Sequence, residues 1–158
     1  MLAHAAFARL RLAHFFPELP VLGPDPKDPG VGRRLARKAI LLVDNWEYDD
    51  RINVGEVFGF TEVLRAKKDP ERTRSVTIAL GEMPAKKWKA IVGALGLPVE
   101  KGMTARALIA RLGKPAGREA FVPGQSNLLF RTRAPAYRIE CTVRDRGGLS
   151  YVVVRRSP

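Results

Sequence analysis

The sequence has little of what redox, metal and membrane proteins use: among its 158 residues are a single cysteine, Cys141, and two histidines, His4 and His14. One cysteine excludes an intrachain disulfide and gives no sign of an oxidising compartment. No apolar run approaches the roughly 18 residues of a membrane-spanning helix, so we predict no span. Arg9 and Arg11 interrupt the alanine-rich N-terminus, which therefore does not fit a signal peptide. We predict a cytoplasmic protein.

Motifs of the common enzyme classes are also missing. The chain contains no G-x-S-x-G, no phosphate-binding P-loop, no G-x-G-x-x-G and no H-E-x-x-H. Both histidines fall in one predicted helix, without a Ser, Asp or Cys partner at a suitable spacing, and few other groups titrate near neutral pH. We therefore predict that the protein is not an enzyme and that it uses no cofactor.

One acidic cluster is the only candidate for metal or acid–base chemistry. Its members are Asp44, Glu47, Asp49, Asp50 and Glu56. The cluster lacks the D-x-D-x-D-G spacing of a calcium loop, and no histidine lies near it to complete a transition-metal site. We interpret it as a solvated strand end and predict no metal site. A second contact surface around Trp46 and Tyr48 is the alternative.

Positive charge is what the sequence has in excess, with 28 Lys and Arg against 16 Asp and Glu and a net charge of +12. Most of the surplus lies in residues 101–158, which hold 12 basic and 3 acidic side chains. A basic surface attracts an acidic protein, a phosphate backbone or an anionic membrane. The alternative is that the arginines serve solubility alone.

Hydrophobic periodicity divides the chain into segments. A helix is predicted over 2–16, followed by a Pro- and Gly-rich connector to residue 32. Phe7, Phe15 and Phe16 make that helix a candidate arm that docks on the body or on a second copy of the chain, giving a homo-oligomer. Strands are predicted at 39–43, 54–64 and 75–80, with a polar turn at 67–72, and together they form an antiparallel meander.

Two helices and four strands are predicted for residues 84–158. The first helix covers 85–95 and places Trp88 in the core. Thr104 is a suitable N-cap for the second helix, and Gly113 with Pro115 ends it. The strands are predicted near 118–122, 127–132, 136–144 and 149–155.

The last two strands alternate most clearly between apolar and polar residues. The inward phase is predicted to contain Tyr137, Ile139, Cys141, Val143, Leu149, Tyr151 and Val153, with Cys141 as a small buried thiol. Sheets that bind nucleic acid present aromatic side chains on which bases stack. Because both tyrosines fall on the inward phase, the pattern favours an acidic protein partner over nucleic acid.

Several short runs carry a family resemblance. They are Val99 to Thr104, Leu108, Leu112 to Pro115, Leu129-Phe130 and Cys141 to Leu149. Over about residues 84–156 this pattern resembles the scaffold shared by the small lipoprotein subunit of the outer-membrane β-barrel assembly machine (SmpA/OmlA-like) and by β-lactamase-inhibitor proteins. The resemblance implies a helix pair on an antiparallel sheet that binds proteins and is not catalytic. The chain departs from the lipoproteins because we predict no signal peptide for it and its single cysteine, Cys141, is far from the first residue.

Together these observations predict an α+β protein, an antiparallel sheet with a helix pair packed on one face, plus an N-terminal helix and a β-meander. The predicted units are 1–32, 33–83 and 84–158, the last two forming one compact domain. We predict an inhibitor, immunity or adaptor module whose partner-binding residues are Arg131, Arg133, Arg138, Glu140, Arg144, Val152 and Val154. The alternatives are a nucleic-acid-associated protein using the same arginines and a structural subunit of a larger assembly.

Overall fold

The computed structural model describes residues 2–10, 14–15, 21–22, 49–52, 62–66, 69–132 and 136–157. The strand predicted at 39–43 lies outside these ranges, as do most of the connector at 17–32 and most of the strand predicted at 54–64.

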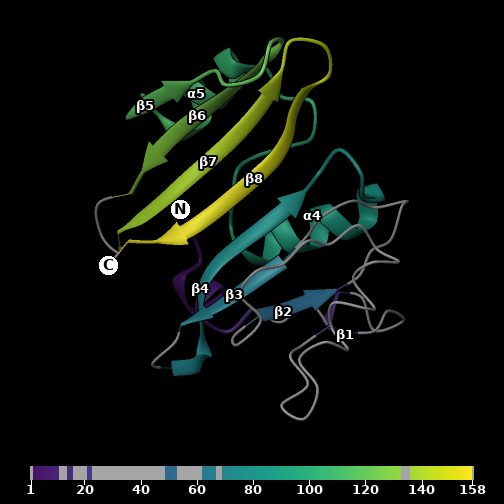
Figure 1. The fold of residues 1–158 in the computed structure, drawn as a ribbon, viewed down its shortest axis with the longest axis vertical. Coiled ribbons are helices and arrows are strands. Elements are labelled where there is room, and N and C mark those ends of the chain that lie inside the picture. The colour runs from purple at the N-terminus through teal and green to yellow at the C-terminus, as the bar shows by residue number, and fades with distance from the viewer. Residues whose placement is uncertain are drawn as a thin grey trace.

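The described residues form an eight-stranded antiparallel sheet with the strand order β1-β2-β3-β4-β8-β7-β6-β5. The strands are β1 (Val21–Leu22), β2 (Asp49–Ile52), β3 (Glu62–Ala66), β4 (Asp69–Ala79), β5 (Gly117–Glu119), β6 (Gln125–Arg131), β7 (Tyr137–Arg144) and β8 (Gly148–Arg156). Figure 1 shows β8 lying between β7 and β4. The predicted α+β class with an antiparallel sheet is confirmed. Because β4 pairs with β8, the segments 33–83 and 84–158 contribute to one sheet.

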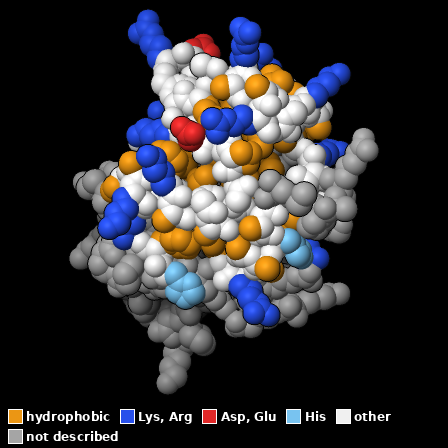
Figure 2. All heavy atoms as spheres, turned by 180° about the vertical axis from the view of Figure 1, so that it is seen from behind, with side chains coloured by type: hydrophobic (Ala, Val, Ile, Leu, Met, Phe, Trp, Pro, Cys, Tyr) orange, Lys and Arg blue, Asp and Glu red, His pale blue; other side chains and the backbone are white. Residues whose placement is uncertain are grey.

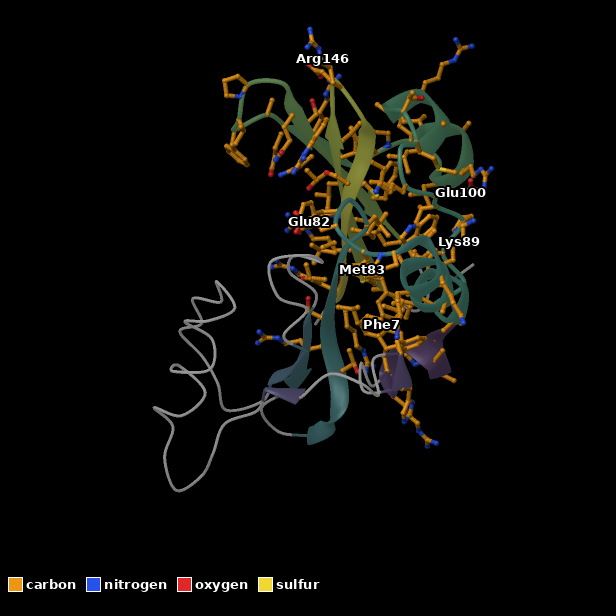
Figure 3. The ribbon with its side chains drawn as sticks, turned by 90° about the vertical axis from the view of Figure 1, so that its right-hand side faces the viewer. Phe7, Glu82, Met83, Lys89, Glu100 and Arg146 are labelled. Carbon is orange, nitrogen blue, oxygen red and sulfur yellow. The ribbon has the colours of Figure 1, made fainter. Side chains whose placement is uncertain are left out.

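Three α-helices are described: α1 (His4–Ala8), α4 (Ala85–Ala94) and α5 (Ala105–Leu112). The predicted cap of α5 is present, because the amide of Ala107 donates to the Thr104 hydroxyl at 3.2 Å. Gly113, with a φ of 88°, ends this helix in a backbone conformation that favours glycine. Figure 3 shows α4 and α5 on the same side of the sheet. We call that side the helical face and the opposite side the outer face.

A single cluster of buried side chains joins the helices to the sheet. The helices contribute Trp88, Ile91, Val92, Leu95 and Leu108, and the central strands contribute Val76, Ile78, Leu128, Phe130, Ile139, Cys141, Val152 and Val154. An eight-residue helix is too short to be stable alone in water, so this burial is what holds α5 in place.

The N-terminal helix is shorter than predicted. α1 covers five residues, and Arg9 follows it with a φ of −119°. Phe7 is fully buried and meets Tyr137 edge-on, with ring centroids 4.9 Å apart, while His4 Nδ1 hydrogen-bonds with the Tyr137 hydroxyl. The amide of Ala3 donates to the carbonyl of Leu95 at 2.8 Å. Phe7 thus docks on the body of its own chain and is not available to a second copy.

The segment predicted as a polar turn at 67–72 belongs mostly to a strand. β4 begins at Asp69, which pairs with Ala66 of β3. Its first residues, Asp69 and Pro70, have low strand propensity, so pairing with β3 has overridden the local preference. Irregular register on both sides of Arg65 accompanies this extension.

Leu149 is buried as predicted, but from Tyr151 onward the inward phase of β8 is the reverse of the prediction. Thr142 pairs with Tyr151, whereas the next residue of β7, Val143, pairs with Leu149, so Ser150 is an extra residue between the two pairs. Such a bulge shifts the alternation by one position. Val152 and Val154 therefore belong to the buried core, while Tyr151 and Val153 lie half-buried on the outer face.

Candidate functional site: the outer face of the sheet and a cavity at its end

Three arginines stand side by side on the outer face. Arg131 of β6 pairs with Arg138 of β7, and Arg138 pairs with Arg155 of β8. Arg131 and Arg155 are exposed, and the Arg138 side chain retains 42% of its accessible surface. Directly paired residues have Cβ atoms about 5 Å apart, so these side chains form a continuous row across neighbouring strands. We call Arg131, Arg138 and Arg155 the arginine row.

The arginine row is only partly neutralised. Glu140 is two residues along β7 from Arg138, and its Oε1 lies 2.8 Å from Arg138 Nε. Among the residues that the structure describes, no acidic side chain forms an ion pair with Arg131 or Arg155. Like charges directly opposite one another in a sheet are destabilising. The arginine row therefore concentrates positive charge and lowers the stability of the sheet as long as no partner neutralises it.

Less polar residues continue the outer face beyond the row. Leu129, Glu140 and Val153 form the next set of paired positions across β6, β7 and β8. Leu129 and Val153 are half-buried. The outward positions of β4 are less accessible, because Thr73, Ser75 and Ala79 are buried and Thr77 is half-buried. The more accessible part of the outer face is thus its β6, β7 and β8 portion, which carries the exposed Arg131 and Arg155.

Positive charge is not confined to the outer face. Exposed or half-buried basic side chains of the helices and adjoining loops include Lys86, Lys87, Lys89, Lys101, Arg106 and Arg111. Figure 2 views the molecule from the side opposite to that of Figure 1 and shows Lys and Arg side chains spread over this side. What distinguishes the arginine row is its register on paired strands rather than the number of charges.

The predicted binding residues separate in the structure. Arg131, Arg138 and Glu140 do lie together, and Arg155 joins them. Arg144 lies at the other end of β7, roughly 20 Å from Arg138 at the usual rise of a strand. Arg133 lies outside the described residues. Val152 and Val154 were expected on the outer face, but both are fully buried, because the bulge at Ser150 reverses the phase of β8.

Tyr151, like Val153, lies on the outer face although the sequence pattern assigned it to the core. Its hydroxyl hydrogen-bonds with the Glu82 carboxylate. Burial, together with this hydrogen bond and the charge of Glu82, raises the pKa of Tyr151 to about 12, against a lowering effect of Arg144. The outward position of Tyr151 follows from the bulge at Ser150. The sequence signal for irregular backbone nearby was the pair Gly147-Gly148, in the turn and at the first position of β8.

A cavity of about 410 Å³ lies at the hairpin end of the sheet. Its lining residues come from the start of α5, from β5, β6 and β7, and from the β7–β8 turn; they are Gly102, Thr104, Ala105, Arg118, Ser126, Val143, Arg144, Asp145, Gly147 and Gly148. Arg118 Nη2 donates to the Ser126 hydroxyl at 3.0 Å. The charged residues among those that line the cavity are Arg118, Arg144 and Asp145.

Backbone contacts fix the walls of this cavity. The amide of Gly102 donates to the carbonyl of Leu149 at 2.9 Å, and the amide of Leu149 donates to the carbonyl of Met103 at 2.8 Å. On the opposite wall, the amide of Asp145 donates to the carbonyl of Gly124 at 2.8 Å. The loop before α5 is thus held against the start of β8, as a neighbouring strand would be.

Cys141 and the acidic cluster, the other candidates from the sequence, belong neither to the arginine row nor to the cavity. Cys141 is buried as predicted, and burial raises the pKa of its thiol to about 12, which keeps it protonated and unreactive. Asp49 and Asp50 lie in β2, whereas Asp44, Glu47 and Glu56 lie outside the described residues. Within the described part of the chain, His, Cys, Asp and Glu residues form no group that could hold a metal ion. The described helices are all too short to cross a membrane.

Comparison with known proteins gives a distant likeness in fold. No protein-family model matches the chain, and no curated protein matches it. A crystal structure of a DUF4309 family protein (YjgB) from Bacillus subtilis subsp. subtilis str. 168 aligns with a TM-score of 0.43 and 12% sequence identity, over 86% of this chain and 82% of that one. A likeness at this level carries no functional conclusion.

Proposed function

We propose that the protein is a non-catalytic, cytoplasmic binding module of the adaptor, inhibitor or immunity type, and that it binds an acidic protein through the outer face of its sheet. The observation that carries the proposal is the pairing of Arg131, Arg138 and Arg155 on neighbouring strands. An acidic partner would supply the carboxylates that this row lacks, and arginine pairs with carboxylates in a bidentate geometry.

The neighbouring outer-face positions suit a protein partner. Leu129 and Val153 provide partly accessible apolar surface next to the charged row. Protein interfaces combine an apolar centre with a polar rim and are enriched in arginine. The accessible outer face of β6, β7 and β8 offers that combination.

A capture experiment with matched variants tests the proposal. The wild-type protein is used to isolate partners from its native cell extract, with and without nuclease, and the affinity for the purified partner is then measured. We expect one acidic protein that survives nuclease treatment. The double variant R138Q/R155Q should bind it at least about tenfold more weakly. R106Q on α5 removes an exposed charge from the helical face and should bind normally. Equal losses in both variants would contradict the proposal.

Nucleic acid is the second candidate, and the position of Tyr151 favours it. The inward phase predicted for this residue counted against base stacking, but Tyr151 lies on the outer face and within the electrostatic influence of Arg144. A single-stranded oligonucleotide titration at several salt concentrations distinguishes the two candidates. Binding that weakens steeply with salt, and that Y151A reduces, would replace the protein partner with a nucleic acid.

A further inference from the structure

We propose that the arginine row binds an acidic α-helix of the partner protein, and that this helix lies across β6, β7 and β8 rather than along them. The inference rests on the proposed function and names the structure that the acidic partner presents to the row. It follows from the spacing of Arg131, Arg138 and Arg155, which occupy directly paired positions on three strands that lie side by side (Figure 1).

The length of the arginine row matches one repeat of an α-helix. Neighbouring strands lie about 4.8 Å apart, so the two steps from Arg131 to Arg155 cover roughly 10 Å. Carboxylates at positions i, i+4 and i+7 of a helix share one face and also extend over about 10 Å. Three carboxylates on one face of an extended strand extend over roughly 13 to 14 Å. A helix therefore meets all three guanidinium groups with less adjustment than an extended segment does.

The row has three members because the paired positions on both sides of it differ. Next to Arg155 is Ser75 of β4, which is buried. On the other side, β5 pairs with β6 only as far as Leu129, so none of the described strands continues the row beyond Arg131. The recognised length is thus about two turns of helix.

The positions beside the row call for an apolar stripe next to the acidic one. Leu129, Glu140 and Val153 lie two residues away along their strands, about 6.8 Å from the arginine row. A helix with its side chains is about 10 to 12 Å wide, so a helix on the row also covers these positions. Leu129 and Val153 offer half-buried apolar surface, whereas the Glu140 carboxylate repels a further acidic residue. We therefore expect an acidic stripe over the arginines and an apolar stripe beside it.

A second copy of this chain does not supply such a helix from its described part. The three described helices have the sequences HAAFA, AKKWKAIVGA and ARALIARL, and none of them contains Asp or Glu. With a net charge of +12, two copies would also repel each other. The complementary helix therefore belongs to a different, acidic protein.

Synthetic peptides test the proposal on the full chain. The matched peptide is an alanine-rich helix with glutamate at i, i+4 and i+7 and leucine along the adjacent stripe. The scattered peptide has the same composition, but its glutamates stand at i, i+2 and i+5, on different sides of the helix. Fluorescence anisotropy at constant ionic strength measures the dissociation constants. We expect the matched peptide to bind at least about tenfold more tightly than the scattered one.

A third peptide separates recognition of the stripe from simple attraction of charge. In this peptide glutamate replaces the leucine stripe, so it carries more negative charge than the matched peptide. It should nevertheless bind more weakly, because the added carboxylates approach Glu140, and E140Q should narrow the difference between the two peptides. If the third peptide bound more tightly than the matched one, or if the scattered peptide bound equally well, the helix would be rejected while an acidic partner would remain.

Variants of the chain locate the contact with the matched peptide. R131Q and R155Q, at the two ends of the row, should each raise its dissociation constant about fivefold or more. R106Q on the helical face is the control and should leave the dissociation constant unchanged. Equal weakening by R106Q and R155Q, or no binding of the matched peptide, would overturn the inference. Tighter binding of a single-stranded oligonucleotide than of the matched peptide would assign the row to a nucleic acid and would also remove the proposed function.

Discussion

Gly148 is packed against the backbone of Gly102, and no larger residue fits in its place. A Cβ atom at position 148 would overlap the carbonyl group of Gly102 and stand 2.8 Å from the carbonyl oxygen of Met103. Gly148 also has a φ of 66°, which side chains rarely adopt. This contact joins the β7–β8 turn to the loop before α5, so one position secures both the hairpin and the helix.

Gly148→Ala should therefore lower the free energy of unfolding by about 2 to 4 kcal/mol, the sum of backbone strain and overpacking. Gly147→Ala is the matched control, because its φ is also positive at 105° but its added Cβ would meet nothing within 4 Å. We expect a loss of about 1 to 2 kcal/mol for the control. Urea unfolding measures both values. A loss at position 148 no greater than that at 147 would contradict the close contact.

The bulge in β8 is tested by comparing adjacent valines. Val152 is fully buried, so Val152→Ala removes core contacts and should cost about 2 kcal/mol. Val153 is only half-buried on the outer face, and Val153→Ala should cost under about 1 kcal/mol. Chemical denaturation compares the two variants. A larger loss for Val153→Ala would restore the uninterrupted alternation that the sequence predicts.

Neighbouring residues of α5 test its orientation. Leu108 is fully buried, whereas the adjacent Ile109 is 40% exposed. Leu108→Ala should cost about 2 to 5 kcal/mol, as other buried leucines do. Ile109→Ala should cost less than half as much, because the Ile109 side chain is partly in water in the folded protein and its truncation removes fewer buried contacts. Thermal unfolding at one pH separates the two variants, and similar losses would mean that α5 is rotated about its axis.

The C-terminal half was predictable because its signals are local. The helix ends follow from Thr104 and Gly113, whose capping and φ requirements depend only on nearby backbone. The inward phase of β7 follows from strict alternation between Tyr137 and Val143, and the structure confirms it. The arginines at 131 and 138 come together because the register of β6 on β7 continues without interruption.

The misplaced residues depend on longer-range structure. The phase of β8 depends on one extra residue, Ser150, and alternation of apolar residues on either side of a bulge does not show where it occurs. Arg155 lies opposite Arg138 only because the bulge shifts the register of β8 on β7 by one residue. The cavity needs α5, β5, β6 and the β7–β8 turn to converge, which no single segment encodes.

Alkaline pH should destabilise the protein through Cys141. Burial raises the pKa of its thiol from an ordinary value of 9.0 to about 12. Above pH 9 the unfolded chain releases this proton while the folded chain retains it, so the free energy of unfolding falls as pH rises toward about 12. Tyr151 acts in the same direction between 10.0 and about 12.

Denaturant unfolding at pH 8.5 and at pH 10.5 measures this effect. Between these two conditions the wild-type protein should lose stability, and Cys141→Ala should lose less, because the variant has no thiol to ionise on unfolding. Tyr151→Phe tests the contribution of the Tyr151 hydroxyl in the same way. Because Tyr151 is less buried than Cys141, this substitution should reduce the loss of stability between the two pH values by less than Cys141→Ala does. A Cys141→Ala variant that declines as steeply as the wild type would show that other groups govern the alkaline limit.

The position of β8 between β4 and β7 has a consequence for synthesis. β4 ends at residue 79, yet the strand that pairs with its free side begins at residue 148. On the ribosome, the completed β4 must therefore wait for almost seventy further residues before it acquires that neighbour. During this interval an unpaired edge is exposed to other nascent chains, and a chaperone that shields it would raise the yield of folded protein.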